Sequence, residues 1–510
     1  MQNSKKVAYN LSLGMASQLL NIVLGIIVPR LVLTSYGSEV NGLVNTVTQI
    51  YTYIALLEAG IGTSTVQALY KTIGSKNRDG TNAVLAASNH YFRQTGRFYL
   101  LAILIFSVVF PLVVETTIPT HTVALIIIFN GLGSVISYFF QSKYLLLLRA
   151  EGKHYVQTIM NMVINVLKNV AKIVLMAVGV DVVFVQMIGM GISLLQMIWV
   201  FFYIRKHYRW IDLTVEPDFG SISQRKNVMV HQISGLIFNN TDTILLSVAC
   251  GLKAVSVYSL YTLLIGMVST ALSTVTSSFL FALGQIFHTD KGRYRKLFEC
   301  YEMYYMALVF SLYAVAQLFL LPFMKLYTSG VTDIDYLDPQ LPFLFIFTHL
   351  LSSGRSACNQ AINVAGHFKL TQNRAIAESA INLTVSLAAV WHFGIYGVLF
   401  GTIAALLYRT NDIILYTNEK ILDRKPWLTY RRWFLNMGVY ILVTKAGHYL
   451  LSFAALDSYL SVFFWAAVCC VVIIPLFFAA VSVQDRDTYR YAKSLLMPHL
   501  QGVMRKLRHK

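Results

Sequence analysis

Long apolar segments separated by short polar ones extend along the whole chain. A helix that crosses a bilayer needs about 20 mostly apolar residues, and the pattern predicts about fourteen such helices. The predicted spans are residues 7–33, 41–69, 97–118, 121–145, 156–178, 182–204, 227–249, 254–287, 298–326, 340–364, 373–393, 395–418, 433–455 and 458–482. The connecting segments are shorter than about 30 residues, which leaves no room for a soluble catalytic domain.

The composition agrees with an all-α polytopic membrane protein. Of the 510 residues, 56% are hydrophobic and 13% are charged, whereas soluble domains average about 25% charged residues. The five cysteines form no CxxC pair, and most lie within apolar segments. We therefore interpret them as small apolar side chains rather than as metal ligands or disulfides.

Basic residues alternate between the two sides of the predicted membrane. Lys and Arg accumulate in cytoplasmic loops. Here 33 of the 41 lie at the N-terminus, in the C-terminal tail or in loops that follow even-numbered spans. This alternation predicts an even number of spans with both termini on the cytoplasmic side. It also accounts for the net charge of +18 without a nucleic-acid partner.

Two pairs of glycines indicate an internal repeat. Gly37 and Gly251 each end an odd-numbered span, Gly152 and Gly366 each follow the fourth span of a half, and both pairs are 214 residues apart. We predict two six-helix bundles in a parallel pseudo-twofold repeat plus two C-terminal helices, an arrangement that places a transport site between the halves. The predicted parts are a first bundle at 1–206, a cytoplasmic linker at 207–225, a second bundle at 226–420, transmembrane helices 13 and 14 at 421–482, and a cytoplasmic basic tail at 483–510.

Two predicted spans carry cationic stripes at helical spacing. The fifth span has Asn161, Asn165, Lys168 and Lys172 on one face, and the tenth has Arg355, Asn359 and Asn363. A charge at the bilayer centre costs about 2.5–3.5 kcal/mol, so it usually faces an aqueous cavity or an opposite charge. We predict that the two stripes line one cleft and bind an anionic substrate. The alternative is that the cations pair with Glu58, Glu378 or Asp242 and only hold helices together.

Other charged residues within the spans have two interpretations each. Arg30 either faces the cleft or extends to the membrane interface, and Arg409 is expected to pair with Asp412, one turn further on. The acids Asp242, Glu58 and Glu378 are candidates to bind a coupling H⁺ or Na⁺, although helix–helix pairing is the more frequent role of such acids.

The sequence contains no motif for catalysis or for a resident cofactor. It has no GxxxxGK[ST] phosphate loop, no GxSxG elbow and no His/Cys/Glu cluster with metal-ligand spacing. We therefore expect no enzyme activity, no metal site and no cofactor apart from a coupling ion.

Two stretches resemble a known transporter family. Residues 29–43 read PRLVLTSYGSEVNGL, LLEAGIG and ALYK follow before residue 72, and residues 239–247 read NNTDTILLS, with Tyr258 after them. These motifs resemble the Wzx-type polysaccharide flippases of the polysaccharide transport branch of the MOP exporter superfamily. The resemblance covers the whole chain in span count and is sharpest over 1–75 and 225–262.

The resemblance implies a function. The chain would move undecaprenyl-diphosphate-linked oligosaccharide from the cytoplasmic to the outer leaflet of a bacterial inner membrane by alternating access, for O-antigen, capsule or exopolysaccharide synthesis. The cations would then bind the diphosphate and the asparagines the sugar hydroxyls. We expect a monomer in contact with membrane lipid, with a polysaccharide polymerase and a chain-length regulator as candidate partners. The alternative, a MATE-like cation-coupled multidrug antiporter, is disfavoured by the basic balance at mid-membrane.

Overall fold

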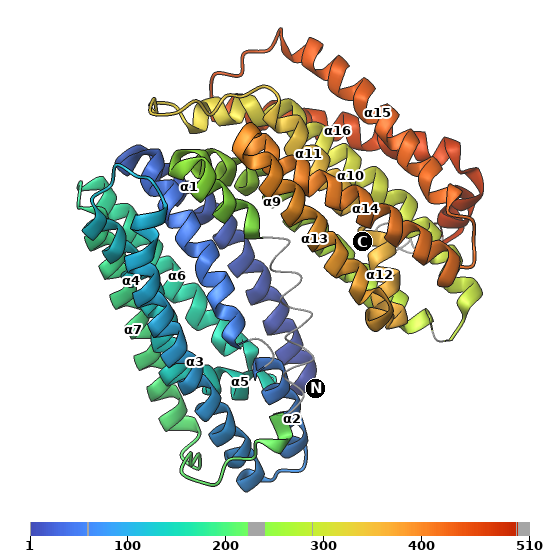
Figure 1. Cartoon of the computed structure of the whole chain (residues 1–510). Helices are drawn as coiled ribbons and strands as arrows, with labels where there is room; N and C mark the ends of the chain where they lie inside the picture. Colours follow the sequence, from blue (N-terminus) through green and yellow to red (C-terminus); the bar gives the residue numbers. More distant parts are fainter. Residues whose placement is uncertain (1, 59–60, 223–239, 288, 496, 498–510) are drawn as a thin grey trace, which may run out of the picture. The chain divides into compact units, whose positions relative to one another are not determined.

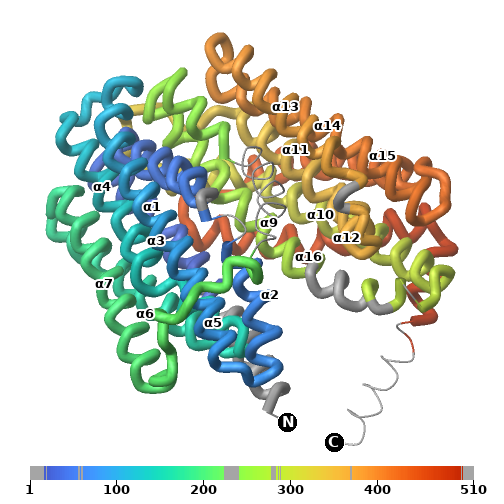
Figure 2. Tube along the Cα trace, turned by 60° about the horizontal axis from the view of Figure 1, so that its bottom comes forward, coloured from blue at the N-terminus to red at the C-terminus, as the bar shows by residue number. Residues whose placement is uncertain are grey.

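The protein is a multi-pass α-helical membrane protein (Figures 1 and 2). The computed structural model describes residues 2–58, 61–222, 240–287, 289–495 and 497, and these residues form helices and connecting segments without a β-strand. Within them, ten helices are long and apolar enough to cross a membrane. The predicted all-α class is confirmed, whereas the count of fourteen spans stays a prediction. The predicted span at 227–249 is described only from residue 240.

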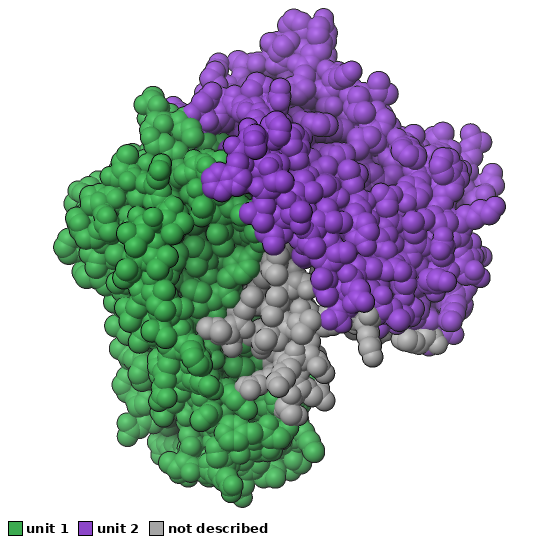
Figure 3. Space-filling model, viewed as in Figure 1, with its two compact units in different colours: residues 1–259, 330–334 green, residues 260–329, 335–510 purple. Residues whose placement is uncertain are grey.

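The chain divides into two compact units, coloured separately in Figure 3. Unit 1 contains residues 1–259 and 330–334, and unit 2 contains residues 260–329 and 335–510. The division falls inside α9 (Gly251–Phe287). The predicted part boundaries, including the linker at 207–225, stay predictions.

Unit 1 is built from long helices that pack side by side. Its elements are α1 (Gln2–Ile54), η1 (Ala55–Glu58), α2 (Ile61–Gly74), α3 (Arg78–Val113), α4 (Thr120–Ile136), the π-helical η2 (Ser137–Gln141), α5 (Ser142–Ala150), α6 (His154–Ala177), α7 (Val182–His207), η3 (Gly220–Ile222), a helical segment at 240–249 and the start of α9. Neighbouring pairs are α1 with α6, α6 with α7, α7 with α4, and α4 with α3.

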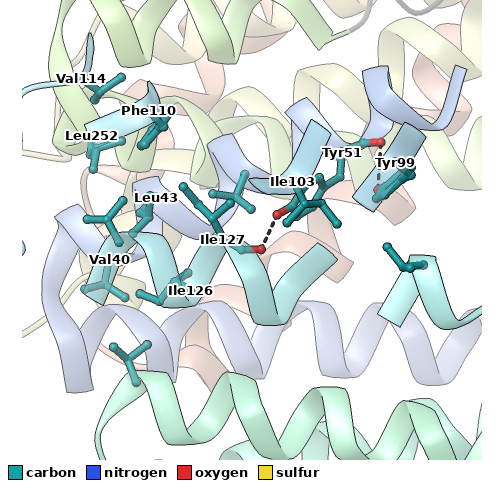
Figure 4. Close-up of a cluster of buried hydrophobic side chains, with 14 of the residues drawn as sticks. Val40, Leu43, Tyr51, Tyr99, Ile103, Phe110, Val114, Ile126, Ile127 and Leu252 are labelled. Carbon is teal, nitrogen blue, oxygen red and sulfur yellow. Dashed lines mark hydrogen bonds between the residues drawn. The ribbon is translucent and has the colours of Figure 1, made fainter. Parts of the chain in front are cut away.

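A buried apolar cluster joins α1, α3 and α4 of unit 1 (Figure 4). Tyr51 of α1 packs against Tyr99 of α3, with 5.9 Å between the ring centroids, and Leu43 of α1 and Ile103 of α3 belong to the same cluster. The Tyr51 hydroxyl donates to the carbonyl of Ile127 in α4. Gly131 permits this close packing, because a Cβ there would lie 2.5 Å from the Ile103 Cδ1 atom. These three helices therefore form a tightly packed support for the rest of the unit.

The first predicted boundary coincides with a break in α1. At Gly37 the backbone adopts φ 83°, which glycine tolerates at little cost. The Asp333 carboxylate then caps the second half of α1, accepting from the Ser38 N–H at 3.0 Å and the Ser38 hydroxyl at 2.6 Å. The next predicted span, 41–69, differs from the structure, because the α-helix ends at Ile54 and η1 and α2 follow.

Unit 2 repeats much of this element order. After the second part of α9 come α10 (Lys291–Tyr327), α11 (Leu341–Gly354), α12 (Ser356–Ala365), α13 (Phe368–Phe393), α14 (Ile395–Lys420), α15 (Trp427–Leu451) and α16 (Tyr459–Gln484). Helix α10 packs against α11, α15 and α16, and α13 packs along α14. The predicted single span at 340–364 is divided at Gly354, whose absent Cβ leaves room for the Trp433 ring of α15.

The element bounds confirm the internal repeat. Helices α3, α5, α6 and α7 recur as α10, α12, α13 and α14, each starting 213 or 214 residues later. The two glycine pairs also share a backbone conformation: φ is 83° at Gly37 and 80° at Gly251, and 70° at Gly152 and 69° at Gly366. The glycines that lie 214 residues apart in the sequence therefore occupy equivalent turns.

A buried ionic cluster attaches the two C-terminal helices to unit 2. Glu302 of α10 is fully buried and accepts from Arg424 at 2.6 Å and from Arg432 of α15 at 2.5 Å. Arg432 also donates to Asp485, just after α16, at 2.6 Å. A buried ion pair broken on one side is strongly destabilising, so this cluster fixes α15 and α16 to α10.

Candidate functional site

A polar cavity of about 410 Å³ lies inside unit 1, between α4, η2, α6 and α7. Three helices each contribute a polar stripe to its wall. The polar lining includes Asn130, Ser134, Ser137 and Gln141 from α4 and η2, Gln157, Asn161, Lys168 and Lys172 from α6, and Gln186, Ser193 and Gln196 from α7. The lining residues include two lysines and no carboxylate.

The two lysines provide the charge of this cavity. Lys168 and Lys172 lie one turn apart on α6 and are half-buried. Within the described part of the chain, neither forms a salt bridge. Two like charges at this spacing repel each other, and partial burial strengthens the repulsion. An anion that entered the cavity would reduce the repulsion between the two ammonium groups. It would also replace the water that partial burial removes from them.

The two predicted asparagines of this stripe have different surroundings. Asn161 lines the cavity, where its Oδ1 atom accepts from Gln196 Nε2 of α7 at 2.8 Å. Asn165 instead donates to Asn21 Oδ1 of α1 at 2.6 Å and accepts from Asn169 at 2.9 Å. Asn161 is therefore available to a ligand, whereas Asn165 joins α6 to α1.

The π-helical turn η2 brings further polar groups to the cavity wall. Gln141 is buried and donates to Ser137 Oγ at 3.1 Å, while Ser142 Oγ donates to the Ser137 carbonyl at 3.1 Å. These side-chain bonds support the widened turn, a feature that often occurs at functional sites. The turn therefore contributes Ser137 and Gln141 to the cavity that Lys168 and Lys172 of α6 also line.

Our sequence prediction missed two of the three stripes. Gln186, Ser193 and Gln196 of α7 are spaced i, i+7 and i+10, and the stripe of α4 and η2 has the same periodicity. This helical spacing is the signal that could have identified them. It was overlooked because uncharged polar residues are tolerated in membrane helices more readily than lysines.

The cation of the second stripe is paired inside unit 2. Arg355, at the break between α11 and α12, donates to Glu378 of α13 at 2.7 Å. Glu378 also lies 3.4 Å from Arg409, which donates to Asp412 at 2.5 Å, as predicted. Arg374 donates to the same aspartate at 2.6 Å. The alternative interpretation, in which Arg355 pairs with Glu378, therefore describes this residue.

The remaining residues of the second stripe follow Arg355 along the chain. Asn359 and Asn363 lie on α12 and are half-buried, and Asn363 donates to Gln360 at 3.1 Å. The cluster contains three arginines and two carboxylates, and the buried Arg355 Nη1 atom has no hydrogen-bond partner. Some positive charge therefore remains, although most is neutralised within the protein.

The other candidate acids and Arg30 lie in unit 1, outside the cavity lining. Asp242 is buried and accepts from the Tyr258 hydroxyl at 2.9 Å. Glu58 shares a hydrogen bond with the Tyr138 side chain. Arg30 is half-buried on α1. Asp242 and Glu58 are thus hydrogen-bonded to tyrosine side chains, whereas Glu378 is paired with arginines.

Comparison with solved structures identifies the fold. This chain resembles the lipid II flippase MurJ in an inward closed conformation, with a TM-score of 0.69 and 12% sequence identity. The match covers 93% of this chain and 98% of the MurJ chain.

It also resembles an inward-facing multidrug resistance MATE family transporter of the MOP superfamily, over 81% of this chain and 98% of that one, with a TM-score of 0.60 and 15% identity. A third match is the MATE multidrug transporter DinF-BH, over 82% and 97% of the two chains, with a TM-score of 0.57 and 13% identity. No protein-family model matches the sequence, and no curated protein matches it. The chain therefore has the fold shared by these transporters.

Proposed function

We propose that this protein is a flippase that moves a lipid-linked oligosaccharide with a diphosphate group from the inner to the outer leaflet. The observation that carries the proposal is the polar cavity of unit 1, which has two lysines and no carboxylate in its lining. Phosphate oxygens accept charge-assisted hydrogen bonds from ammonium groups. The amides and hydroxyls around the lysines suit sugar hydroxyls.

The fold supports transport rather than catalysis. The similar structures named above are a lipid II flippase and multidrug transporters. An undecaprenyl-diphosphate carrier, movement by alternating access and a role in surface polysaccharide synthesis extend the proposal on the basis of the Wzx-like motifs. The same motifs support our proposal that the protein lies in the bacterial inner membrane, and the alternation of basic loops supports cytoplasmic termini.

The residues then have separate roles. Lys168 and Lys172 hold the diphosphate, and Asn161 contacts the sugar beside it. Arg355 contributes the smaller positive charge that remains in unit 2, and the neutral amides of Asn359 and Asn363 offer hydrogen bonds to sugar hydroxyls. Asp242 and Glu58 are the acids we propose for a coupling H⁺ or Na⁺, because Glu378 is occupied by two arginines.

Export of cationic drugs is the second candidate, since MATE transporters share the fold. A cationic substrate is stabilised by carboxylates, and the cavity of unit 1 contains lysines instead. Drug efflux from cells that express the protein distinguishes the two functions. Efflux that persists in a Lys168→Gln/Lys172→Gln double variant would favour the antiporter.

A reconstituted assay tests the flippase directly. The purified protein is placed in liposomes, and transfer of undecaprenyl-diphosphate-linked oligosaccharide between leaflets is measured with and without ion gradients. We expect Lys168→Gln and Lys172→Gln each to slow transfer by about tenfold or more, because each removes a charge-assisted hydrogen bond.

Two variants complete the design. Lys168→Arg/Lys172→Arg retains the charge and should restore much of the rate, and Lys325→Gln removes an exposed lysine at the end of α10 as a matched control. Full activity in the double Gln variant would overturn the assignment of this cavity.

A further inference from the structure

Two adjoining hollows on unit 1 form a basic groove outside the polar cavity. One hollow, of about 630 Å³, is bordered by Arg93 and Arg97 of α3 and Lys143 of α5. The other, of about 700 Å³, is bordered by Arg205, Lys206 and Arg209 at the end of α7. Both include Tyr144, Phe201 and Phe202, so an aromatic ridge separates two clusters of three cations.

The cations of the groove lack acidic partners. Neither hollow has a carboxylate in its lining, and within the described chain none of the six side chains forms a salt bridge. Lys143 is buried and donates to Asn89 Oδ1 at 2.7 Å and to the Phe139 carbonyl at 3.3 Å. Its ammonium group is thus held by neutral acceptors, so that neither of these two partners neutralises its charge at the edge of the hollow.

The groove is apolar beside its cations. Phe140, Phe201 and Phe202 are each more than half exposed, and Ile198 is also exposed. Further along α3, Leu101 and Ile105 extend the exposed apolar face. In a membrane protein such a face contacts acyl chains, and aromatic and basic side chains mark the level of the headgroups. A ligand that contacts both the cations and the apolar face of the groove must be anionic and amphipathic.

We propose that this groove binds an anionic membrane phospholipid, whose phosphate groups contact the two basic clusters and whose acyl chains lie against the aromatic ridge. Basic pockets between transmembrane helices bind anionic lipid headgroups in this way. A lipid with two phosphate groups, such as diphosphatidylglycerol, matches the two clusters on either side of the ridge.

The groove is distinct from the proposed transport site. It shares no lining residue with the polar cavity. One segment nevertheless contributes to both, since Gln141 faces the cavity while Lys143 and Tyr144 border the groove. The lipid would therefore contact the segment that forms the cavity wall, and its binding does not depend on the identity of the transported molecule.

Lipid titration of the full-length protein tests the proposal. Native mass spectrometry in detergent would measure binding of diphosphatidylglycerol, phosphatidylglycerol and phosphatidylcholine. We expect affinity to fall in that order. The Arg205→Gln/Lys206→Gln/Arg209→Gln variant should bind diphosphatidylglycerol about tenfold to 100-fold more weakly, because each basic residue near anionic lipid contributes substantially to binding.

The control removes the same charge elsewhere. Lys291→Gln/Arg293→Gln/Lys420→Gln neutralises three exposed cations that border none of these hollows and should bind like the unchanged protein. Thermal unfolding without lipid checks that both variants are folded, and Arg205→Lys/Arg209→Lys should retain binding. Equal lipid affinity in the groove and control variants, or full displacement of the lipid by inorganic phosphate at equal concentration, would overturn the proposal.

Discussion

The two units differ in how the charges of their membrane-spanning helices are neutralised. In unit 1, Lys168 and Lys172 face a cavity whose lining contains no carboxylate. In unit 2, Arg355 and Arg409 are held by Glu378. Charges that are neutralised within the protein stabilise helix packing. Charges without acidic partners destabilise the fold unless a ligand of opposite charge binds them. This difference is the reason why we propose unit 1 as the ligand-binding half of the repeat.

The helix packing differs in the same sense. The positions that correspond to Lys168 and Lys172 in the repeat are Asn382 and Ser386, which are both buried. There α13 and α14 approach closely, since a Cβ at Gly401 would lie 2.0 Å from Ser386 Oγ and one at Gly397 would lie 2.4 Å from the Ala389 carbonyl oxygen. The space that is a cavity in unit 1 is thus occupied by helix contacts in unit 2.

The largest expected effect comes from removing the acid of unit 2. Glu378→Gln leaves Arg355 with uncompensated charge in a partly buried site and leaves Asp412 as the remaining acid beside Arg409, which we expect to destabilise the protein by about 3–5 kcal/mol. Thermal or denaturant unfolding of the purified protein measures this. Glu419→Gln, at an exposed position of the neighbouring α14, is the control and should change stability by less than about 0.5 kcal/mol.

A double variant sharpens that result. Replacing Glu378 and Arg355 together, as Glu378→Gln/Arg355→Met, removes the unpaired charge of Arg355 and should recover part of the lost stability. If Glu378→Gln unfolds like the unchanged protein, then the ionic cluster of unit 2 is not neutralised as the contacts indicate.

A smaller effect is expected from closing the glycine contact of unit 2. Gly401→Ala places a methyl group against Ser386, including its backbone nitrogen at 2.7 Å, and should destabilise by about 1–3 kcal/mol. Gly191→Ala on α7 is the matched change in unit 1, where nothing lies within 4 Å of the added Cβ. It should leave stability unchanged or raise it by up to about 1 kcal/mol. Similar unfolding of the two variants would contradict the difference in packing.

The smallest effect on stability is expected at the lysines. Lys172→Met removes one of two like charges in unit 1 and breaks no salt bridge, so stability should stay within about 1 kcal/mol or increase. The leaflet-transfer rate should nevertheless fall, as for Lys172→Gln. A large loss of stability would mean that Lys172 has a structural role like that of Arg355.

Much of the fold could be predicted from the sequence, because lipid imposes a simple rule on apolar length and on the placement of basic loops. The glycine pair at 37 and 251 identified the repeat, since only glycine adopts these turns readily. The α6 stripe was likewise evident, because lysines in an apolar helix are conspicuous.

The pairing of charges could not be predicted, because it depends on contacts between distant segments. Arg355 pairs with Glu378, which lies 23 residues further along the sequence, and Glu302 pairs with Arg432, which lies 130 residues further. Helical spacing specifies which face of its own helix a residue occupies, but not which helix lies opposite. Asn165 illustrates this: its spacing matched that of Asn161, yet its hydrogen bonds lead to Asn21 and Asn169.

The Glu302 cluster has a consequence for how the protein is made. Arg424 and Arg432 follow Glu302 by 122 and 130 residues, so at ordinary rates of translation the carboxylate waits roughly 10 s for its counterions. Until then the acid must stay hydrated or protonated, and α10 cannot adopt its final environment. A chain shortened after α14 would keep this acid without either arginine. The last two helices are therefore part of the biogenesis of unit 2, which is completed from its C-terminal end.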